Sequence, residues 1–256
     1  MSKIVAIVNQ KGGVGKTTTA VNLAAAVAAK GKKVLLADID PQGNATSGFG
    51  VNKKEVALST YDLLINQAEA KAAIVQTKYK NLWVLPANMN LAGAEIELVD
   101  MPKRESRLKL ALAPIDADYD YIFLDCPPSL GIITLNGLTA ADSVLVPIQC
   151  EYYALEGLSQ LMSTVRTVKR KYNEYLEMEG VLLTMYDGRL NLTAQVVEEV
   201  KKFFPKKVFT TAIPRNVRLS EAPGFGEPVR YYDPQSKGAK MYDQLASEFL
   251  RNNRKK

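Results

Sequence analysis

Short apolar segments rich in Val, Ile and Leu recur along the chain, and polar or helix-forming stretches separate them. Such continuous apolar runs are typical of strands that are buried on both faces, as strands of parallel sheets are. On this basis we predict seven strands, at Ile4–Val8, Val34–Ala37, Leu82–Leu85, Tyr121–Leu124, Ser143–Ile148, Val181–Met185 and Val208–Ile213.

Four of the intervening stretches predict helices. Thr18–Lys30 is rich in Ala and is followed by Gly31, a residue type that commonly ends helices. The other three stretches are Glu156–Tyr172, Asn191–Phe204 and Ala239–Leu250. Because strands alternate with helices, we expect an α/β fold: a single doubly wound domain over residues 1–256, with a mostly parallel sheet flanked by helices.

The segment KGGVGKTT directly follows the first predicted strand and opens the first predicted helix, which is the position of a phosphate-binding loop. Its glycines allow the backbone N–H groups to turn inward as an anion site. Lys16 can reach the β- and γ-phosphates of a nucleotide, and the Thr17 hydroxyl suits Mg²⁺. We expect nucleotide contacts from Lys11, Gly12, Gly13, Val14, Gly15, Lys16, Thr17 and Thr18.

This loop departs from the usual phosphate-loop pattern of P-loop NTPases, G-x-x-x-x-G-K-S/T. The first glycine of that pattern would fall on Gln10, and a second lysine, Lys11, stands at the head of the loop instead. The expected α/β fold and this loop together indicate a P-loop NTPase whose phosphate loop departs from the usual pattern.

Aspartates follow two of the predicted strands, where parallel strands bring their carboxyl ends together. Asp38 and Asp40 end the second strand, and Asp125 ends the fourth. A single aspartate at a strand end is often only a turn or cap residue. Two such clusters beside a phosphate loop indicate a Mg²⁺ site, for which we predict Thr17, Asp40 and Asp125 as ligands. Asp40 is also our candidate for orienting the attacking water.

Composition narrows the chemistry further. The 256 residues include no histidine, which excludes a Ser-His-Asp triad and histidine-ligated metals. The two cysteines, Cys126 and Cys150, are too few for a disulfide framework and suit a reducing compartment. With no signal-peptide pattern and no apolar run of about 20 residues, we predict a cytoplasmic protein without a membrane span.

The net charge of +6 is uneven along the chain. Residues 1–150 carry 15 Lys/Arg and 14 Asp/Glu, whereas residues 151–256 carry 18 and 13. A basic excess in one part of a protein suits a polyanionic partner such as nucleic acid or an anionic membrane, but a solvated basic surface explains it equally well.

Several blocks of the sequence closely resemble the ParA/Soj family of partition ATPases, within the deviant-Walker-A (ParA/MinD) group. Besides the phosphate loop they are DIDPQGN (38–44), LAGAEIEL (91–98), DCPPSLG (125–131), PIQCEYYALEGL (147–158) and IPRNVRLSEAP (213–223). The resemblance covers nearly the whole chain. It implies an ATPase that uses ATP and Mg²⁺, forms a homodimer around the nucleotide, and acts in chromosome or plasmid partitioning.

The resemblance also implies roles for single residues. Lys11 resembles the lysine that reaches the phosphates of the partner subunit, and with Lys16 and Asp40 it forms the expected catalytic set. Asp125 is similar to the Walker-B aspartate. Pro214 and Asn216 lie where the family contacts adenine, mainly through the backbone. The implied partners are non-specific double-stranded DNA and a ParB/Spo0J-type protein, and the implied location is the nucleoid.

For the DNA contacts we favour two arginines in the more basic part of the chain, Arg189 and Arg218. Non-specific binding needs cations on phosphates and little reading of bases. Weaker candidates are Lys201, Lys202, Lys206, Lys207, Lys237 and Lys240. The cluster Arg166–Lys171 is better explained as the polar face of a helix.

Two other ATPase classes share this type of loop. A membrane-positioned ATPase similar to MinD needs an amphipathic C-terminal segment. Here Tyr242, Leu245, Ala246, Phe249 and Leu250 predict a packed helix stripe, and residues 251–256 include no apolar side chain. An iron–sulfur ATPase similar to the nitrogenase iron protein would use two cysteines per chain. We interpret both cysteines as small core residues.

Overall fold

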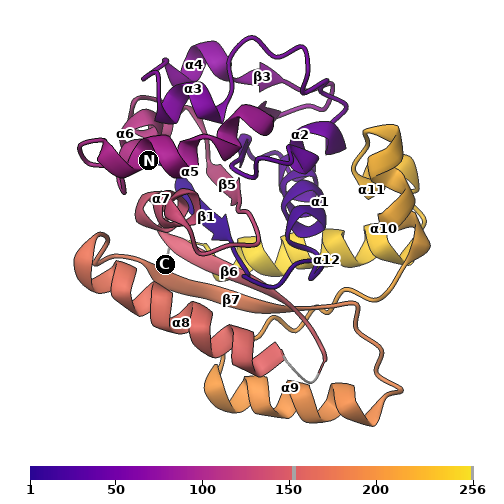
Figure 1. The fold of residues 1–256 in the computed structure, drawn as a ribbon. Coiled ribbons are helices and arrows are strands. Elements are labelled where there is room, and N and C mark those ends of the chain that lie inside the picture. Colours follow the sequence, from indigo (N-terminus) through magenta and orange to yellow (C-terminus); the bar gives the residue numbers. More distant parts are fainter. Residues whose placement is uncertain (152–153, 255–256) are drawn as a thin grey trace.

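Seven strands form one sheet in the order β3-β4-β2-β5-β1-β6-β7 in the computed structural model, which describes residues 1–151 and 154–254 (Figure 1). All neighbouring strands are parallel except β3, which is antiparallel to β4. The strands are β1 (Lys3–Ile7), β2 (Val34–Asp38), β3 (Val75–Gln76), β4 (Leu82–Leu85), β5 (Tyr121–Asp125), β6 (Ser143–Gln149) and β7 (Glu177–Thr184). The predicted mostly parallel sheet is confirmed.

Helices connect the strands and cover both faces of the sheet. They are α1 (Lys16–Ala29), α2 (Asn44–Gly48), α3 (Thr60–Leu64), α4 (Ala70–Ala73), α5 (Ala94–Glu97), α6 (Arg107–Leu112), α7 (Ile132–Ala140), α8 (Ala154–Lys171), α9 (Asn191–Phe203), α10 (Val217–Glu221), α11 (Val229–Tyr232) and α12 (Lys237–Asn252). The four predicted helices correspond to α1, α8, α9 and α12, with ends that differ by at most two residues. The shorter helices between residues 44 and 112 were not predicted.

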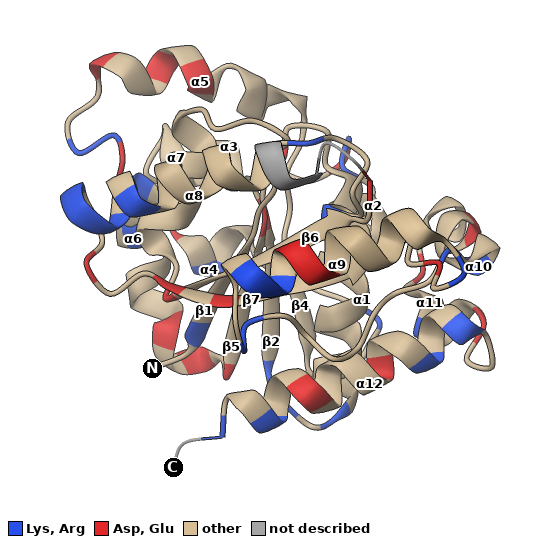
Figure 2. Ribbon diagram, turned by 90° about the horizontal axis from the view of Figure 1, so that it is seen from below, with Lys and Arg blue, Asp and Glu red and all other residues tan. Residues whose placement is uncertain are grey.

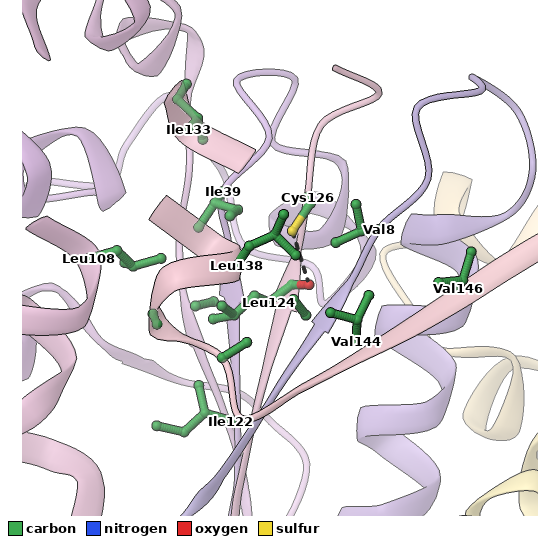
Figure 3. Close-up of a cluster of buried hydrophobic side chains, with 14 of the residues drawn as sticks. Val8, Ile39, Leu108, Ile122, Leu124, Cys126, Ile133, Leu138, Val144 and Val146 are labelled. Atoms are coloured by element: carbon green, nitrogen blue, oxygen red, sulfur yellow. Dashed lines mark hydrogen bonds between the residues drawn. The ribbon is translucent and has the colours of Figure 1, made fainter. Parts of the chain in front are cut away.

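Successive residues of a strand contribute to opposite faces of the sheet, as the pleat requires. In β1, Val5 and Ile7 belong to the core that includes α1 and α12, whereas Ala6 belongs to the core on the other face. That second core joins Leu124 and Cys126 to side chains of α6 and α7 (Figure 3). Because both faces are buried, the strands are apolar throughout, which is the pattern that the sequence shows.

The last predicted strand, Val208–Ile213, is wrong. This segment runs beside β7 but is joined to it only by an isolated parallel bridge, between Val181 and Val208, and a second bridge, between Tyr186 and Pro214, lies just beyond both segments. The physical reason is Glu248 of α12, whose carboxylate accepts hydrogen bonds from the backbone N–H groups of Thr210, at 2.7 Å, and Thr211, at 2.9 Å. These two N–H groups are therefore not available for the regular hydrogen-bond ladder of a strand. The strand predicted at Val181–Met185 also ends earlier, at Thr184, because Met185 adopts a left-handed conformation (φ 49°).

The apolar stripe of α12 is packed, as predicted. Tyr242, Leu245, Ala246 and Phe249 are buried in the core shared with α1, and Leu250 packs against that core. None of the helices in the described part of the chain is long and apolar enough to cross a membrane. Of the tail 251–256, residues 255 and 256 lie outside the described residues.

Glu248 gives a test of how the segment after α9 is held. Burial acts to raise the pKa of Glu248, but the hydrogen bonds from Thr211 and Thr210 outweigh it and lower the pKa below 4.5. Glu248→Ala leaves two backbone donors without their acceptor, so we expect the free energy of unfolding at pH 7 to fall by about 1–3 kcal/mol. A group with a depressed folded pKa stabilises at pH values above its unfolded pKa, and loses this effect as pH falls through the folded pKa.

The loss in free energy of unfolding caused by Glu248→Ala should therefore be smaller in acid than at pH 7. Urea unfolding at pH 7 and at pH values below 4.5 measures this difference. Glu198→Ala is the matched control, because Glu198 is exposed on α9 and should change stability by less than about 0.5 kcal/mol. A Glu248→Ala protein as stable as the control at pH 7 would contradict the assigned role.

Candidate nucleotide site

The order of the strands brings the three predicted motifs to one edge of the sheet. β5 lies between β1 and β2, and the register places Asp125 beside Ile7 on one side and beside Asp38 on the other. The loop that follows β1 therefore emerges directly beside the end of β5 that carries Asp125, and the end of β2 lies on the other side of β5. This is the arrangement that the sequence predicted for a phosphate loop with its carboxylates.

The phosphate loop has the backbone that its glycines allow. Gly13 (φ 74°) and Gly15 (φ 85°) adopt the left-handed conformation, and Gly15 precedes the first residue of α1. The N-terminus of α1 thus points its unpaired N–H groups and its positive dipole end at the loop. Inside the loop, the buried Lys16 donates from Nζ to the Lys11 carbonyl at 3.1 Å. Burial lowers the pKa of Lys16, and the charges of Asp125, Cys126 and Asp40 oppose that shift.

Buried side chains fix the loop to its neighbours. Thr184, at the end of β7, donates from Oγ1 to the carbonyls of Val14, at 2.8 Å, and Ile148, at 3.0 Å. Asn9 donates to the Pro147 carbonyl at 2.8 Å and accepts from the Lys11 N–H at 3.0 Å. The loop is therefore held from β6 and β7 as well as from its own strand.

The two aspartates that end β2 and β5 have different surroundings. Asp38 accepts hydrogen bonds from the N–H and the hydroxyl of Thr46, at 2.8 and 2.7 Å. Burial raises the pKa of Asp38 to about 6, although the Thr46 bonds oppose this. Both oxygens of Asp125 are buried without a hydrogen-bond partner in the described part of the chain. Its pKa is raised well above the ordinary value by burial and then by Asp38, whereas Thr17 lies close enough to oppose the shift.

An unpartnered buried carboxylate beside a threonine hydroxyl suits a divalent cation. Mg²⁺ is usually held by one or two protein carboxylates together with nucleotide phosphates, so a larger cluster of carboxylates is not required. The residues present therefore fit the predicted ion through Asp125 and Thr17. Asp40, the third predicted ligand, is buried, and its Oδ1 accepts from the Gln42 N–H at 2.9 Å.

Lys11 makes a contact that the sequence did not indicate. Its Nζ forms an ion pair with the Glu151 carboxylate of the same chain at 2.7 Å, and both side chains are partly exposed. The hydrogen bond from Lys11 lowers the pKa of Glu151, and the charge of Arg215 acts in the same direction. Glu151 belongs to the block Pro147–Leu158, of which residues 152 and 153 lie outside the described residues.

A cavity of about 390 Å³ opens beside the phosphate loop, and Gly15 and Thr18 contribute to its lining. Pro214 and Asn216 line the same cavity, so both predicted base contacts share it with the loop. The Asn216 side chain caps α10 by accepting from the Arg218 N–H at 3.1 Å. Its amide is thus engaged locally, which agrees with recognition through the backbone.

Both predicted DNA-contacting arginines are engaged by carboxylates. Arg189 makes two hydrogen bonds to Asp187, at 2.9 and 2.6 Å. Arg218 pairs with Glu221 at 2.8 Å and with Asp233 at 3.2 Å. Among the weaker lysine candidates, Lys202 pairs with Glu199 at 2.5 Å, and Lys207 donates to the Met178 carbonyl at 2.7 Å.

The cysteines are core residues, as interpreted from the sequence. Cys126 and Cys150 are both free and buried. Burial raises the pKa of the Cys126 thiol well above its ordinary value and that of Cys150 to about 11. Iron–sulfur clusters are held by thiolates, which these surroundings disfavour.

Three residues important for the site were missed from the sequence. Thr46 satisfies Asp38, and Thr184 supports the phosphate loop. Glu95 accepts from the Ile132 N–H at 3.0 Å and so caps α7, at the end of the loop that follows Asp125. Of these three, only Glu95 could have been singled out from the sequence, because it stands in the block LAGAEIEL, which resembles the family.

Known proteins resemble this chain over most of its length. Residues 2–178 match the family described as AAA domain. The chain is 60% identical to the sporulation initiation inhibitor protein Soj of Bacillus subtilis, covering 98% of this chain and 100% of that protein. It is 51% identical to the chromosome-partitioning ATPase Soj of Treponema pallidum, covering 98% of each.

Among solved structures, a cobyrinic acid a,c-diamide synthase from Mycobacterium smegmatis with bound ADP and magnesium superposes with a TM-score of 0.86 at 40% identity. The match covers 98% of this chain and 95% of that one. The identity to the two Soj proteins is higher and extends over nearly their whole lengths. The chain therefore belongs to the Soj/ParA family of chromosome-partitioning ATPases.

Proposed function

We propose that this protein binds ATP and Mg²⁺, dimerises around the nucleotide, and in that state binds DNA without sequence preference, until hydrolysis releases the DNA. The observation that carries the proposal is Asp125, whose two buried oxygens have no hydrogen-bond partner among the described residues and lie beside the phosphate loop. A buried carboxylate without a partner is costly, and a Mg²⁺–nucleotide complex offsets that cost. The whole chain acts as one ATPase domain in the cytoplasm, on nucleoid DNA.

The proposed roles follow from the geometry of the site. The backbone of residues 11–15 holds the phosphates, and Lys16 exchanges the Lys11 carbonyl for phosphate oxygens. Thr17, Asp40 and Asp125 hold Mg²⁺, which neutralises charge on the phosphates when it is bound. Asp40 orients the attacking water. Pro214 and Asn216 contact the base, and Thr18 lies between the base and the phosphates.

Lys11 changes partners in this proposal. In the monomer its ammonium group contacts Glu151, and in the dimer it contacts the phosphates bound to the other subunit. Exposed ion pairs contribute little to stability, so this exchange costs little. The altered position of the loop lysine is thereby explained, because Lys16 already serves the phosphates of its own subunit.

The remaining partners are proposed from family membership and charge. Residues 151–256 carry 18 Lys/Arg and 13 Asp/Glu, and this excess suits DNA phosphates. A ParB/Spo0J-type protein stimulates hydrolysis. Dimerisation places two weak DNA surfaces in one particle, which raises the affinity through avidity.

Assembly is the first consequence to test. We expect Asp40→Ala to bind ATP without hydrolysing it, and to sediment as a dimer with ATP and as a monomer without nucleotide. Adding Lys11→Ala should abolish the dimer and leave ATP binding largely intact, because Lys16 still serves the phosphates. The matched control is Lys32→Ala, which removes an exposed lysine paired with Asp120. Analytical ultracentrifugation that finds the Lys11→Ala protein dimerising like the control would refute the role of Lys11.

Turnover should be slow in the isolated protein. The loop Asn9–Thr18 includes no arginine, and the chain includes no histidine. An arginine supplied by a partner can raise such a rate by about 10³–10⁵. Phosphate release should therefore rise when DNA and a ParB-type protein are added together. Turnover that instead depended on a carboxylic acid and an amide donor would favour a synthase, the activity named for the structure at 40% identity.

The DNA surface can be tested by a salt series on two unrelated duplexes. Arg189→Ala and Arg218→Ala should weaken binding equally on both duplexes and leave ATP-dependent dimerisation unchanged. Removing one arginine–phosphate interaction should reduce the slope of log K against log salt by about 0.9. Arg170→Ala, which removes an exposed arginine of α8, is the control. Weakening on one duplex alone would indicate base reading and would exclude the non-specific interaction.

A further inference from the structure

The two arginines assigned to DNA lie on neighbouring segments. A Cβ on Gly238 would lie 2.8 Å from the Leu219 side chain, so the first turn of α12 packs closely on α10. Arg218 on α10 pairs with Asp233, which shortly precedes α12. The bridge between Tyr186 and Pro214 brings the loop that carries Arg189 to the segment preceding α10. Both α10 and the adjoining end of α12 carry basic and acidic residues (Figure 2).

Carboxylates accompany each arginine on this surface. The Arg189 guanidinium, 89% exposed, contacts both oxygens of Asp187. Arg218 contacts Glu221 through Nη1 and Asp233 through Nε. The hydrogen bonds from Arg189 lower the pKa of Asp187 to about 2, so Asp187 is ionised at neutral pH. Two guanidinium groups therefore face three carboxylates, and these five groups together carry a net charge of −1.

We propose that Asp187, Glu221 and Asp233 are internal counter-ions of the DNA surface, which DNA phosphates must displace to contact Arg189 and Arg218. The inference rests on the proposed DNA binding and identifies these carboxylates as the groups that limit the affinity for DNA. DNA normally exchanges its condensed counter-ions for protein cations. Here each arginine must also leave a carboxylate, and that carboxylate stays close enough to repel the phosphate.

The consequence is a surface that binds DNA weakly in one protomer in spite of its arginines. Two such surfaces in a dimer bind the same duplex, and the second contact is then intramolecular. The carboxylates thus keep the monomer off DNA and make binding depend on assembly. They also allow rapid release, because each arginine has an alternative partner within its own chain.

Neutralising the counter-ions tests this proposal without removing any cation. Asp187→Asn keeps the oxygen that accepts the Arg189 N–H, and Asp233→Asn keeps the oxygen that accepts the Ser236 N–H. Glu221→Gln likewise preserves size. The control for Asp187→Asn is Asp118→Asn, which makes the same change of net charge at an exposed pair with Lys71, and Asp118→Asn combined with Asp120→Asn is the control for the double variant. All variants are compared as dimers with a non-hydrolysable ATP analogue, on one duplex over a salt series.

We expect Asp187→Asn, and Glu221→Gln combined with Asp233→Asn, each to tighten DNA binding roughly two- to fivefold beyond the control, which is the strength of an exposed ion pair. The salt slope should steepen by up to about 0.9 for each additional DNA phosphate that a released arginine neutralises. Without nucleotide, the monomers should begin to bind DNA at low salt. The tighter binding of Asp187→Asn should vanish in an Arg189→Ala background, because no cation is then released.

The outcomes separate this inference from the proposed function. If Arg189→Ala weakens DNA binding but Asp187→Asn matches Asp118→Asn, the counter-ion role is wrong and the DNA surface stands. If Asp187→Asn weakens binding, Asp187 positions the arginine for phosphate, and the proposal is overturned. If neither Arg189→Ala nor Arg218→Ala weakens binding, the DNA surface itself lies elsewhere.

Discussion

The parallel pairing of β5 with both β1 and β2 is the constraint on which the site depends. It aligns Asp125 with Asp38 and with the last residue before the phosphate loop, and it buries both carboxylates at one edge of the sheet. Burial raises the pKa of both, and a neighbouring carboxylate adds to each shift, Asp40 for Asp38 and Asp38 for Asp125. Thr46 opposes the shift of Asp38 through its hydrogen bonds, whereas the oxygens of Asp125 have no hydrogen-bond partner among the described residues, which suits a cationic ligand.

Groups that must keep their position differ from groups that must change partners. Asn9, Asp38 and Thr184 are buried, and each has hydrogen bonds that fix the loops around the nucleotide. Lys11 and Arg189, which are proposed to change partners, form ion pairs at the surface instead. Removing a partner from a buried polar group is costly, whereas water compensates an exposed one. Burial therefore separates the fixed framework from these two ion pairs; the buried Lys16, which is proposed to exchange the Lys11 carbonyl for phosphate oxygens, is the exception.

The sequence predicts most of this architecture, because strands buried on both faces leave a clear apolar pattern and the phosphate loop adjoins the first of them. It fails at Val208–Ile213, where a carboxylate remote in sequence takes the backbone donors. The contact between Lys11 and Glu151 is equally remote. The pair Asp187–Arg189 is local, so it could have been predicted from the sequence. A count of charges misses it, because the count treats every arginine as a free cation, even beside an acidic residue.

One short segment, Ile213–Glu221, joins the two proposed binding surfaces. Pro214 and Asn216 line the cavity beside the phosphate loop, and Arg218 lies two residues further on the DNA side. The link is direct, because the Asn216 side chain that begins α10 accepts the N–H of Arg218. A base bound in the cavity would hold the start of α10 in place, and with it the arginine and the carboxylates around it. In the proposed function, nucleotide binding would therefore position the proposed DNA surface within one protomer, in addition to pairing two such surfaces in a dimer.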